Sequence, residues 1–232
     1  MTDLAVEQPP PRKRAAPKRR RSSGSKLFAH DRRFGSRWVA GADEAGRGCL
    51  AGPLVAAAVL FDLDRITPRE VRALGALNDS KQHTPEAREE LYPRVMRLAA
   101  RVHIVSRCAR GIDGFGLHKT NLAALRDALR GVARPGVVCL SDGFPLGKDF
   151  EWPLTPIVDG DTKSAAIAAA SIVAKVSRDR FMHRAEELHP GWGFAEHVGY
   201  STPEHRQAIR SRGISPLHRL SFQSLAYQQL EL

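Results

Sequence analysis

Three apolar stretches of this chain each end in acidic residues that lie next to a glycine or two positions from one. They cover residues 39–44, 137–142 and 154–161. Short apolar runs that end at glycine are typical of buried strands. The strand ends of an α/β sheet open onto the crevice where ligands bind, so these acids could converge although they are far apart in the sequence. The pattern therefore predicts an α/β fold with a carboxylate-rich site at one edge of its sheet.

The remaining periodicity predicts a mixed α/β domain with a C-terminal helical part. The expected strands cover residues 37–42, 54–61, 102–108, 137–141 and 154–158. The expected helices follow Thr84, follow Asp113 as an N-cap, run from about Ser164 to Leu188, and cover 203–211 and 221–230. With 232 residues, 42% of them hydrophobic, the chain suits one sizeable domain, which we place at 34–232.

Residues 1–33 differ in composition from the rest of the chain. They hold ten Lys or Arg against three acids, which gives them a net charge of +7 out of +11 for the whole chain. Like-charge repulsion and several prolines predict a disordered basic N-terminal tail. Such an arm attracts nucleic acid through counterion release. The alternative is a solubilising or processed extension without a defined partner.

The sequence carries no sign of secretion or membrane insertion. Its first residues include acids and prolines and lack an apolar core, and no segment has the roughly 20 apolar residues that a membrane span needs. Cys49, Cys108 and Cys139 are scattered and form no Cys-x-x-Cys pair, which argues against a disulfide framework or a zinc site. We therefore expect a cytoplasmic protein without membrane contact, and we expect a monomer.

The acids at the three predicted strand ends are candidate metal ligands. Converging carboxylates repel unless a cation lies among them, and oxygen ligands without Cys or His favour Mg²⁺ or Mn²⁺. Two such ions can activate water and bind the attacking and leaving oxygens of a phosphoryl transfer. Structural roles compete: Asp142 could make a turn with Gly143, and Asp161 could cap the following alanine-rich helix. Asp159 lies on the same strand face as Asp161 and leaves the choice between them open.

The pair Asp43 and Glu44 presents a geometric difficulty. Neighbouring side chains of a regular strand point to opposite faces of the sheet. Both acids can therefore serve one site only if the backbone departs from regular geometry there, and Gly46 and Gly48 make such a departure inexpensive.

Seven motifs occur in one order along the chain. They are Asp43-Glu44-Ala45-Gly46-Arg47-Gly48, Asn78-Asp79-Ser80-Lys81, Ser141-Asp142-Gly143, Gly160-Asp161, the stretch 167–179 with Lys175, Arg178 and Asp179, Gly199-Tyr200, and His218-Arg219-x-x-Phe222. Together they resemble type 2 ribonuclease H, also called ribonuclease HII, over about residues 35–232. The resemblance implies a ribonuclease H-like fold, in which helices flank a mixed sheet.

The resemblance also implies an activity and a set of site residues. The expected activity is Mn²⁺- or Mg²⁺-dependent cutting of the RNA strand of RNA–DNA hybrids and of duplex DNA at single ribonucleotides, as in ribonucleotide excision during DNA replication and repair. The catalytic, metal-binding acids would be Asp43, Glu44, Asp142 and Asp161. Gly46, Arg47 and Gly48 would grip the ribonucleotide, Tyr200 would pack on its ribose, and Lys81 would contact a phosphate. Asp159 departs from the family, which more often has a basic residue before Gly-Asp.

Other residues and functions stay open in the sequence. Lys175 and Arg178 could face a duplex or form salt bridges, and His218-Arg219 is expected to be structural. A non-catalytic nucleic-acid-binding protein is the main alternative function. A nucleotide-binding enzyme is a third, because 46–52 nearly repeats a dinucleotide fingerprint, but its spacing is off by one and a strand is expected to follow it.

Overall fold

A central five-stranded sheet organises the chain. The computed structural model describes residues 22–222 and Tyr227. The strands are β1 (Trp38–Ala45), β2 (Leu54–Asp62), β3 (Arg101–Arg107), β4 (Val137–Asp142) and β5 (Leu154–Ile157). Their order in the sheet is β3-β2-β1-β4-β5. The pairs β1–β2 and β2–β3 are antiparallel, whereas β1–β4 and β4–β5 are parallel, so the predicted mixed sheet is confirmed.

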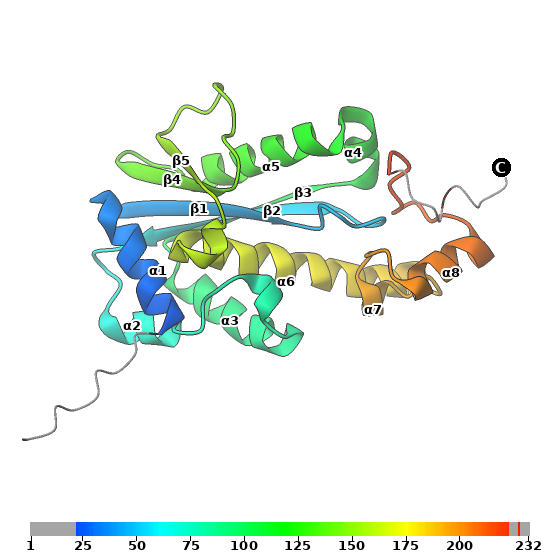
Figure 1. Cartoon of the computed structure of the whole chain (residues 1–232), viewed down its shortest axis with the longest axis horizontal. Helices are drawn as coiled ribbons and strands as arrows, with labels where there is room; N and C mark the ends of the chain where they lie inside the picture. The colour runs from blue at the N-terminus through cyan, green and yellow to red at the C-terminus, as the bar shows by residue number, and fades with distance from the viewer. Residues whose placement is uncertain (1–21, 223–226, 228–232) are drawn as a thin grey trace, which may run out of the picture.

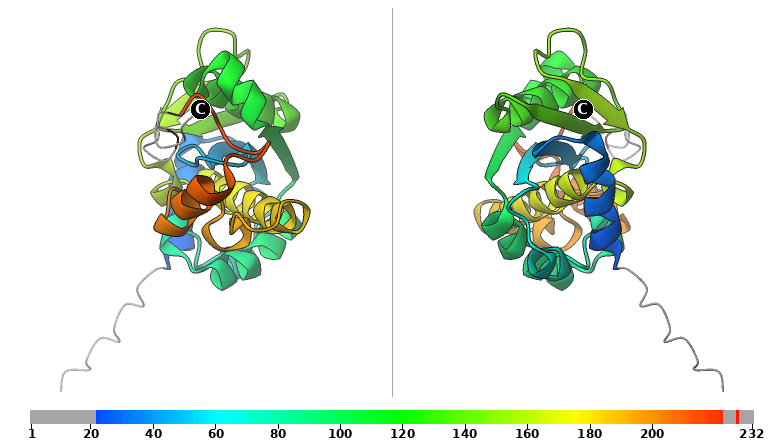
Figure 2. Two further views of the ribbon diagram at one scale, coloured as in Figure 1. Left: turned by 90° about the vertical axis from the view of Figure 1, so that its right-hand side faces the viewer. Right: turned by 90° about the vertical axis from the view of Figure 1, so that its left-hand side faces the viewer.

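Helices cover both faces of this sheet (Figure 1, Figure 2). On one face lie α4 (Ala109–Phe115) and α5 (Leu117–Val132), and on the other lies α6 (Ala165–Leu188). Beyond α6 lie α2 (Pro68–Ala73) and α3 (Pro85–Leu98), and α1 (Ser23–Asp31) runs beside α6 from α2 toward the sheet. The helices α7 (Phe194–His197) and α8 (Pro203–Arg212) lie at one end of the molecule. Short 3₁₀ helices are η1 (Arg32–Phe34), η2 (Ser80–Gln82) and η3 (Gly160–Thr162).

The alanine-rich start of α6 packs very closely on β1. Residues 165–174 are all buried, and their small side chains let the helix backbone approach the strand. Opposite them, a Cβ atom on Gly41 would lie 2.3 Å from the backbone of both Ala166 and Ile167. Only glycine fits at this contact, because the obstructing atoms belong to the main chain. This contact fixes the position of β1 relative to the segment that carries Asp161.

The structure corrects the boundary of the N-terminal tail. Residues 1–21 lie outside the described residues, but Ser23–Asp31 form α1, so the prediction of a disordered tail through residue 33 is wrong for this segment. Leu27 and Phe28 are buried, and the rings of Phe28 and Phe61 lie 5.2 Å apart. The buried Asp31 carboxylate accepts a hydrogen bond from the N–H of Ala166 in the first turn of α6. The helix is therefore part of the folded domain.

Two further predictions concern helices. The structure contradicts the first and describes only a small part of the second. Asp113 lies inside α4 and does not cap α5, which begins after Gly116. Its carboxylate instead accepts hydrogen bonds from the N–H groups of Leu220 and Ser221. The helix expected at 221–230 falls mostly outside the described residues. Within the part of the chain that the structure describes, no helix has the length and hydropathy to cross a membrane.

Candidate active site

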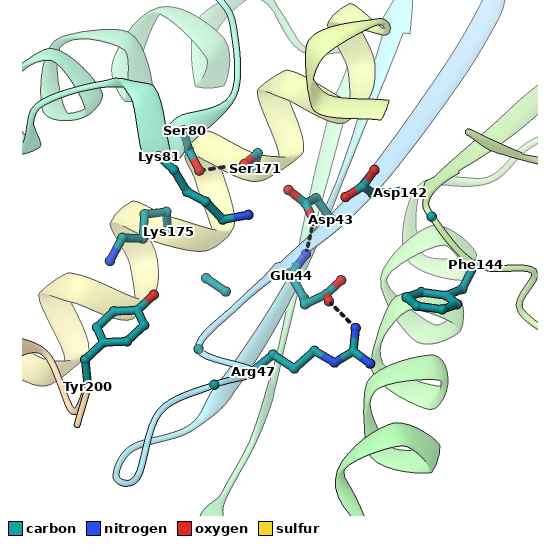
Figure 3. A pocket seen from close by; sticks show the side chains of 14 residues that line it. Asp43, Glu44, Arg47, Ser80, Lys81, Asp142, Phe144, Ser171, Lys175 and Tyr200 are labelled. Atoms are coloured by element: carbon teal, nitrogen blue, oxygen red, sulfur yellow. Dashed lines mark hydrogen bonds and ion pairs between the residues drawn. The ribbon is translucent and has the colours of Figure 1, made fainter. Parts of the chain in front are cut away.

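A polar pocket of about 380 Å³ lies where β1 and β4 end (Figure 3). Its lining includes eight of the nine residues expected from the sequence, namely Asp43, Glu44, Gly46, Arg47, Gly48, Lys81, Asp142 and Tyr200. Asp161, the ninth, is buried in η3 and reaches the same site from the side of α6. The structure thus brings together all the predicted site residues, although they come from widely separated parts of the sequence.

Three aspartates form the centre of this site. Asp43, Asp142 and Asp161 each offer a carboxylate oxygen, and these atoms all lie within 4.8 Å of one another. Two of the three are held by backbone N–H groups: Glu44 donates to Asp43 Oδ1 at 2.7 Å, and Gly160 donates to Asp142 Oδ1 at 2.7 Å. The second bond connects the end of β4 directly to η3, which positions Asp161 beside Asp142.

The geometry favours Asp161 over Asp159. Asp161 is only 7% exposed and belongs to the carboxylate cluster. Asp159 is exposed, adopts a left-handed backbone conformation with φ of 52°, and lies outside this cluster. The side chain of Ser164, not that of Asp161, caps α6 by accepting from the N–H of Ile167. The capping alternative for Asp161 is therefore wrong.

Asp43 and Glu44 share the pocket without any irregularity of β1. The pairing with β2 continues regularly through Asp43, Glu44 and Ala45, so the expected departure from strand geometry is wrong. Asp43 lies beside Ser171 of α6, and Glu44 lies beside Asn121 of α5, which covers the opposite face. Pairing of β1 with β4 stops at Ala42 and Ser141. The end of β1 therefore projects past its neighbour, and the pocket opens onto both of its faces.

Burial and repulsion by neighbouring acids suppress the ionisation of Asp43, Glu44 and Asp161. Burial raises the pKa of Asp43 well above its usual range, and the charges of Glu44 and Asp142 raise it further. Burial also raises the pKa of Glu44, opposed by Arg47 and reinforced by Asp142. Burial, Asp79 and Asp142 raise the pKa of Asp161 to about 6. A cation among the three aspartates would reverse these shifts, because it favours the charged form.

Cationic groups surround the acidic centre. Arg47 forms an ion pair with Glu44 at 3.7 Å, and its guanidinium lies 5.2 Å from the centre of the Phe144 ring. Lys81 extends into the pocket from the opposite side, and Lys175 lies next to Tyr200 with 5.3 Å between its Nζ and the ring centre (Figure 3). Lys175 also pairs with Asp179 at 2.7 Å. The site thus combines a carboxylate cluster with cations suited to phosphate.

Two buried arginines hold the loop that follows β1. Arg178 is fully buried and donates to the carbonyls of Ala51, Pro53 and Val198. Arg219 is also fully buried and donates to the carbonyls of Arg47 and Gly52. The structure therefore excludes a duplex-facing role for Arg178. The structural role expected for His218 and Arg219 is confirmed by their burial and contacts.

Several further residues belong to the site although the sequence alone assigns them no role in it. Ser80, Gly143, Phe144 and Ser171 line the pocket, and the Ser171 hydroxyl lies 2.7 Å from that of Ser80. Asp79 lies beside Asp161 and raises its pKa. Asp79, Ser80 and Ser171 fall inside the sequence motifs, and this position is a signal that could identify them as site residues. Phe144 carried no such signal, because an exposed aromatic in a loop has no characteristic spacing.

Solved structures of similar architecture identify the fold of this chain. Ribonuclease H2 from Pyrococcus horikoshii matches with a TM-score of 0.70 and 24% identity, covering 83% of this chain and 96% of that chain. Bst-RNase HIII in complex with Mn²⁺ matches with a TM-score of 0.64 and 20% identity, covering 86% and 71%. These likenesses show that the chain has a ribonuclease H-like fold.

The sequence comparison narrows this class to one family. The family model described as ribonuclease HII matches residues 40–225. The ribonuclease HII of Mycobacterium bovis is 47% identical over 185 residues, which cover 79% of this chain and 67% of that protein. The chain belongs to the ribonuclease HII family, and it is therefore a nuclease.

Proposed function

We propose that this protein is an endoribonuclease that hydrolyses the RNA strand of RNA–DNA hybrids and cuts duplex DNA at single embedded ribonucleotides, leaving 3′-hydroxyl and 5′-phosphate ends. The observation that carries the proposal is the convergence of Asp43, Asp142 and Asp161 within 4.8 Å, beside a loop that presents Arg47. Binding a nucleic-acid phosphate gives no reason to gather acids, since they repel the ligand. Phosphoryl transfer with a divalent metal does give such a reason.

The donor set of the site fits Mn²⁺ or Mg²⁺. Asp43, Asp142 and Asp161 would hold the ion together with Glu44, and none of the described residues that line the pocket is a histidine or a cysteine. Hard divalent ions prefer such oxygen ligands. Such an ion would supply activation of a water molecule and stabilisation of the oxygens that gain charge in the displacement. Family membership and the Mn²⁺ bound to the related Bst-RNase HIII support this choice of ions.

The protein's own groups orient the substrate around this centre. Arg47 donates a planar pair of N–H groups that matches a phosphate. Lys81 and Lys175 contribute positive charge on the other side of the pocket (Figure 3). A Cβ atom on Gly48 would meet no atom within 4 Å, so the open space over this residue is available to the nucleic-acid backbone. We assign the grip on the scissile nucleotide to Gly46, Arg47 and Gly48.

Distinguishing RNA from DNA at one position requires contact with the 2′-hydroxyl. Tyr200 lines the pocket with 41% of its surface exposed, so its ring is accessible to a sugar. An aromatic ring packs well on the apolar face of a ribose, and its hydroxyl remains available for a hydrogen bond. We assign ribose recognition to Tyr200 together with the glycine loop.

A cleavage assay on matched duplexes tests the proposal. The substrates are an RNA–DNA hybrid, a DNA duplex with one ribonucleotide, and the same duplex without it, each with Mn²⁺, Mg²⁺ or a chelator. We expect cleavage of the first two with either ion, none of the third, none with chelator, and products that a DNA polymerase extends. Tight binding of all three without cleavage under either ion would refute the proposal in favour of a non-catalytic nucleic-acid-binding protein.

A further inference from the structure

Tyr200 follows a backbone turn that proteins rarely adopt. Val198 has φ of +43° and Gly199 has φ of +84°, so two consecutive residues lie in the left-handed region. For a β-branched residue such as Val198 this conformation is strained, and strained residues persist only where the surrounding structure holds them in place. The position of the Tyr200 ring therefore depends on the contacts that maintain this turn.

Several hydrogen bonds maintain the turn. Arg178 donates to the carbonyl of Val198 at 2.8 Å, and Leu50 N–H donates to the carbonyl of Gly199 at 2.9 Å. The N–H of Gly199 donates to Nδ1 of His197 at 3.1 Å. These bonds connect the turn to α6 and to the loop that follows Gly-Arg-Gly.

A chain of two further histidines reaches the same turn from the C-terminal segment. Ser215 N–H donates to His218 Nδ1 at 2.8 Å, so the His218 proton lies on Nε2. Nε2 of His218 lies 3.1 Å from Nε2 of His205, which must accept, and the remaining proton of His205 therefore lies on Nδ1. His205 Nδ1 then donates to the carbonyl of Tyr200 at 2.8 Å.

Every ring nitrogen of His205 and His218 takes part in one of these hydrogen bonds, and both rings are neutral. His205 is fully buried and His218 is 3% exposed. The His205 ring also stacks on that of His197, with 4.1 Å between their centres. Burial lowers the pKa of both His205 and His218 to about 4, which keeps them neutral under physiological conditions. The two histidines and their partners thus form a row of hydrogen bonds in which every donor and every acceptor is defined.

We propose that His205 is a positioning residue, which acts through the Tyr200 backbone to place the Tyr200 ring for ribonucleotide recognition, and that His218 orients His205. The proposal rests on the function proposed above for Tyr200. Neither histidine lines the pocket, so neither contacts the substrate directly. Their effect must therefore pass through the turn at Val198, Gly199 and Tyr200.

Paired substitutions of His205 and His218 test which ring nitrogen donates each hydrogen bond. Asn places an amide near the position of Nδ1, and Gln places one near the position of Nε2. His205→Asn keeps the donor to Tyr200, whereas His205→Gln keeps only the group that faces His218. For His218 the order reverses, because His218→Gln keeps the donor to His205 and His218→Asn does not. We expect kcat/KM on the single-ribonucleotide duplex to fall at least about 10-fold in His205→Gln and to stay closer to wild type in His205→Asn.

A double-substitution cycle separates positioning from a general structural effect. In a Tyr200→Ala background, His205→Gln should cause no further loss, since the ring that it positions is already absent. Additive losses would overturn the proposal, and so would equal activity of His205→Asn and His205→Gln. If melting shows that His205→Gln does not fold, the pair His218→Gln and His218→Asn decides the matter, with the lower activity expected for His218→Asn and the opposite order refuting the proposal.

Amide hydrogen exchange of the full-length protein supplies a readout independent of cleavage. We expect faster exchange at 198–201 in His205→Gln than in His205→Asn, and equal exchange in the two variants would contradict the proposal. Failure of the proposed function is recognisable separately, because the wild-type protein itself would then cleave neither the hybrid nor the single-ribonucleotide duplex.

Discussion

Gly46 lies directly against the buried guanidinium of Arg178. A Cβ atom on Gly46 would be 1.9 Å from Nε of Arg178, and the backbone of Gly46 has φ of +86°. Arg178 cannot yield space, because it is fully buried and bound to three carbonyl groups. The lack of a side chain at Gly46 is therefore a packing requirement, while its backbone lines the pocket. Gly48 instead faces open space.

We predict opposite effects of alanine at the two glycines. Gly46→Ala should destabilise the fold by about 2 kcal/mol or more, through overlap with Arg178 and backbone strain. Gly48→Ala should change stability by less than about 0.5 kcal/mol, yet raise KM for the ribonucleotide duplex. Urea unfolding and steady-state kinetics measure the two effects. A stable Gly46→Ala, or a Gly48→Ala with unchanged KM, would refute the corresponding assignment.

The position of α1 makes a prediction about N-terminal truncation. Removing residues 1–21 takes away basic charge and leaves α1 and its N-cap Ser22 in the chain, so we expect the melting temperature to hold while duplex affinity weakens less steeply with added salt. Removing residues 1–33 also deletes Phe28 and Asp31, which should lower the melting temperature by several degrees. Equal melting temperatures of the two truncations would show that α1 contributes nothing to stability.

Metal affinity should depend on pH around the pKa of Asp161. Burial, Asp79 and Asp142 raise that pKa to about 6, and a carboxyl group must lose its proton to bind a cation. Mn²⁺ affinity should therefore increase as pH rises through about 6, with protons released on binding. Titration calorimetry in buffers of different ionisation enthalpy measures both quantities. Asp159→Asn is the matched control and should follow the wild-type profile, and a flat profile in the wild type would contradict the assignment of Asp161.

The neutral histidines predict an acid-sensitive contribution to stability. The pKa values of His205 and His218 fall from 6.5 to about 4 on folding, so the unfolded chain binds more protons between these values. The two neutral histidines therefore contribute fully to the free energy of unfolding above pH 6.5. This contribution is lost as pH falls toward 4, at up to about 1.4 kcal/mol per pH unit for each histidine. Urea unfolding between pH 7 and 5 should show a steeper loss in wild type than in His218→Gln. Parallel curves would exclude this linkage.

The sequence predicted the central sheet because its strands carry strong local patterns. The positions of the strands and of the α6 helix follow from apolar runs and glycine boundaries, and the convergence of the acids follows from strand ends meeting at one edge. The sequence does not predict the α1 helix, because Leu27 and Phe28 lie within a basic segment whose composition is typical of a disordered tail. The partner of Asp31 lies 135 positions away, so only the folded chain reveals it.

The site shows a similar division. Motifs identified Asp43, Asp142 and Arg47, but spacing could not choose between Asp159 and Asp161, because both lie on the same face of an ideal strand. The left-handed turn at Asp159 separates them and is not encoded by any local pattern. Periodicity also misled at Glu44, since opposite strand faces still reach one pocket where the neighbouring strand ends. The local sequence of β1 does not show where the neighbouring strand β4 ends.

Cleavage of a DNA duplex with one ribonucleotide by Asp142→Asn and Asp159→Asn tests the central claim most directly. The first substitution removes a charge from the carboxylate cluster and the second changes an exposed residue outside it. With saturating Mn²⁺ and both proteins folded, Asp142→Asn should lose activity by about 100-fold or more, while Asp159→Asn remains close to wild type. Full activity of Asp142→Asn would contradict the carboxylate site, and the proposed mechanism with it.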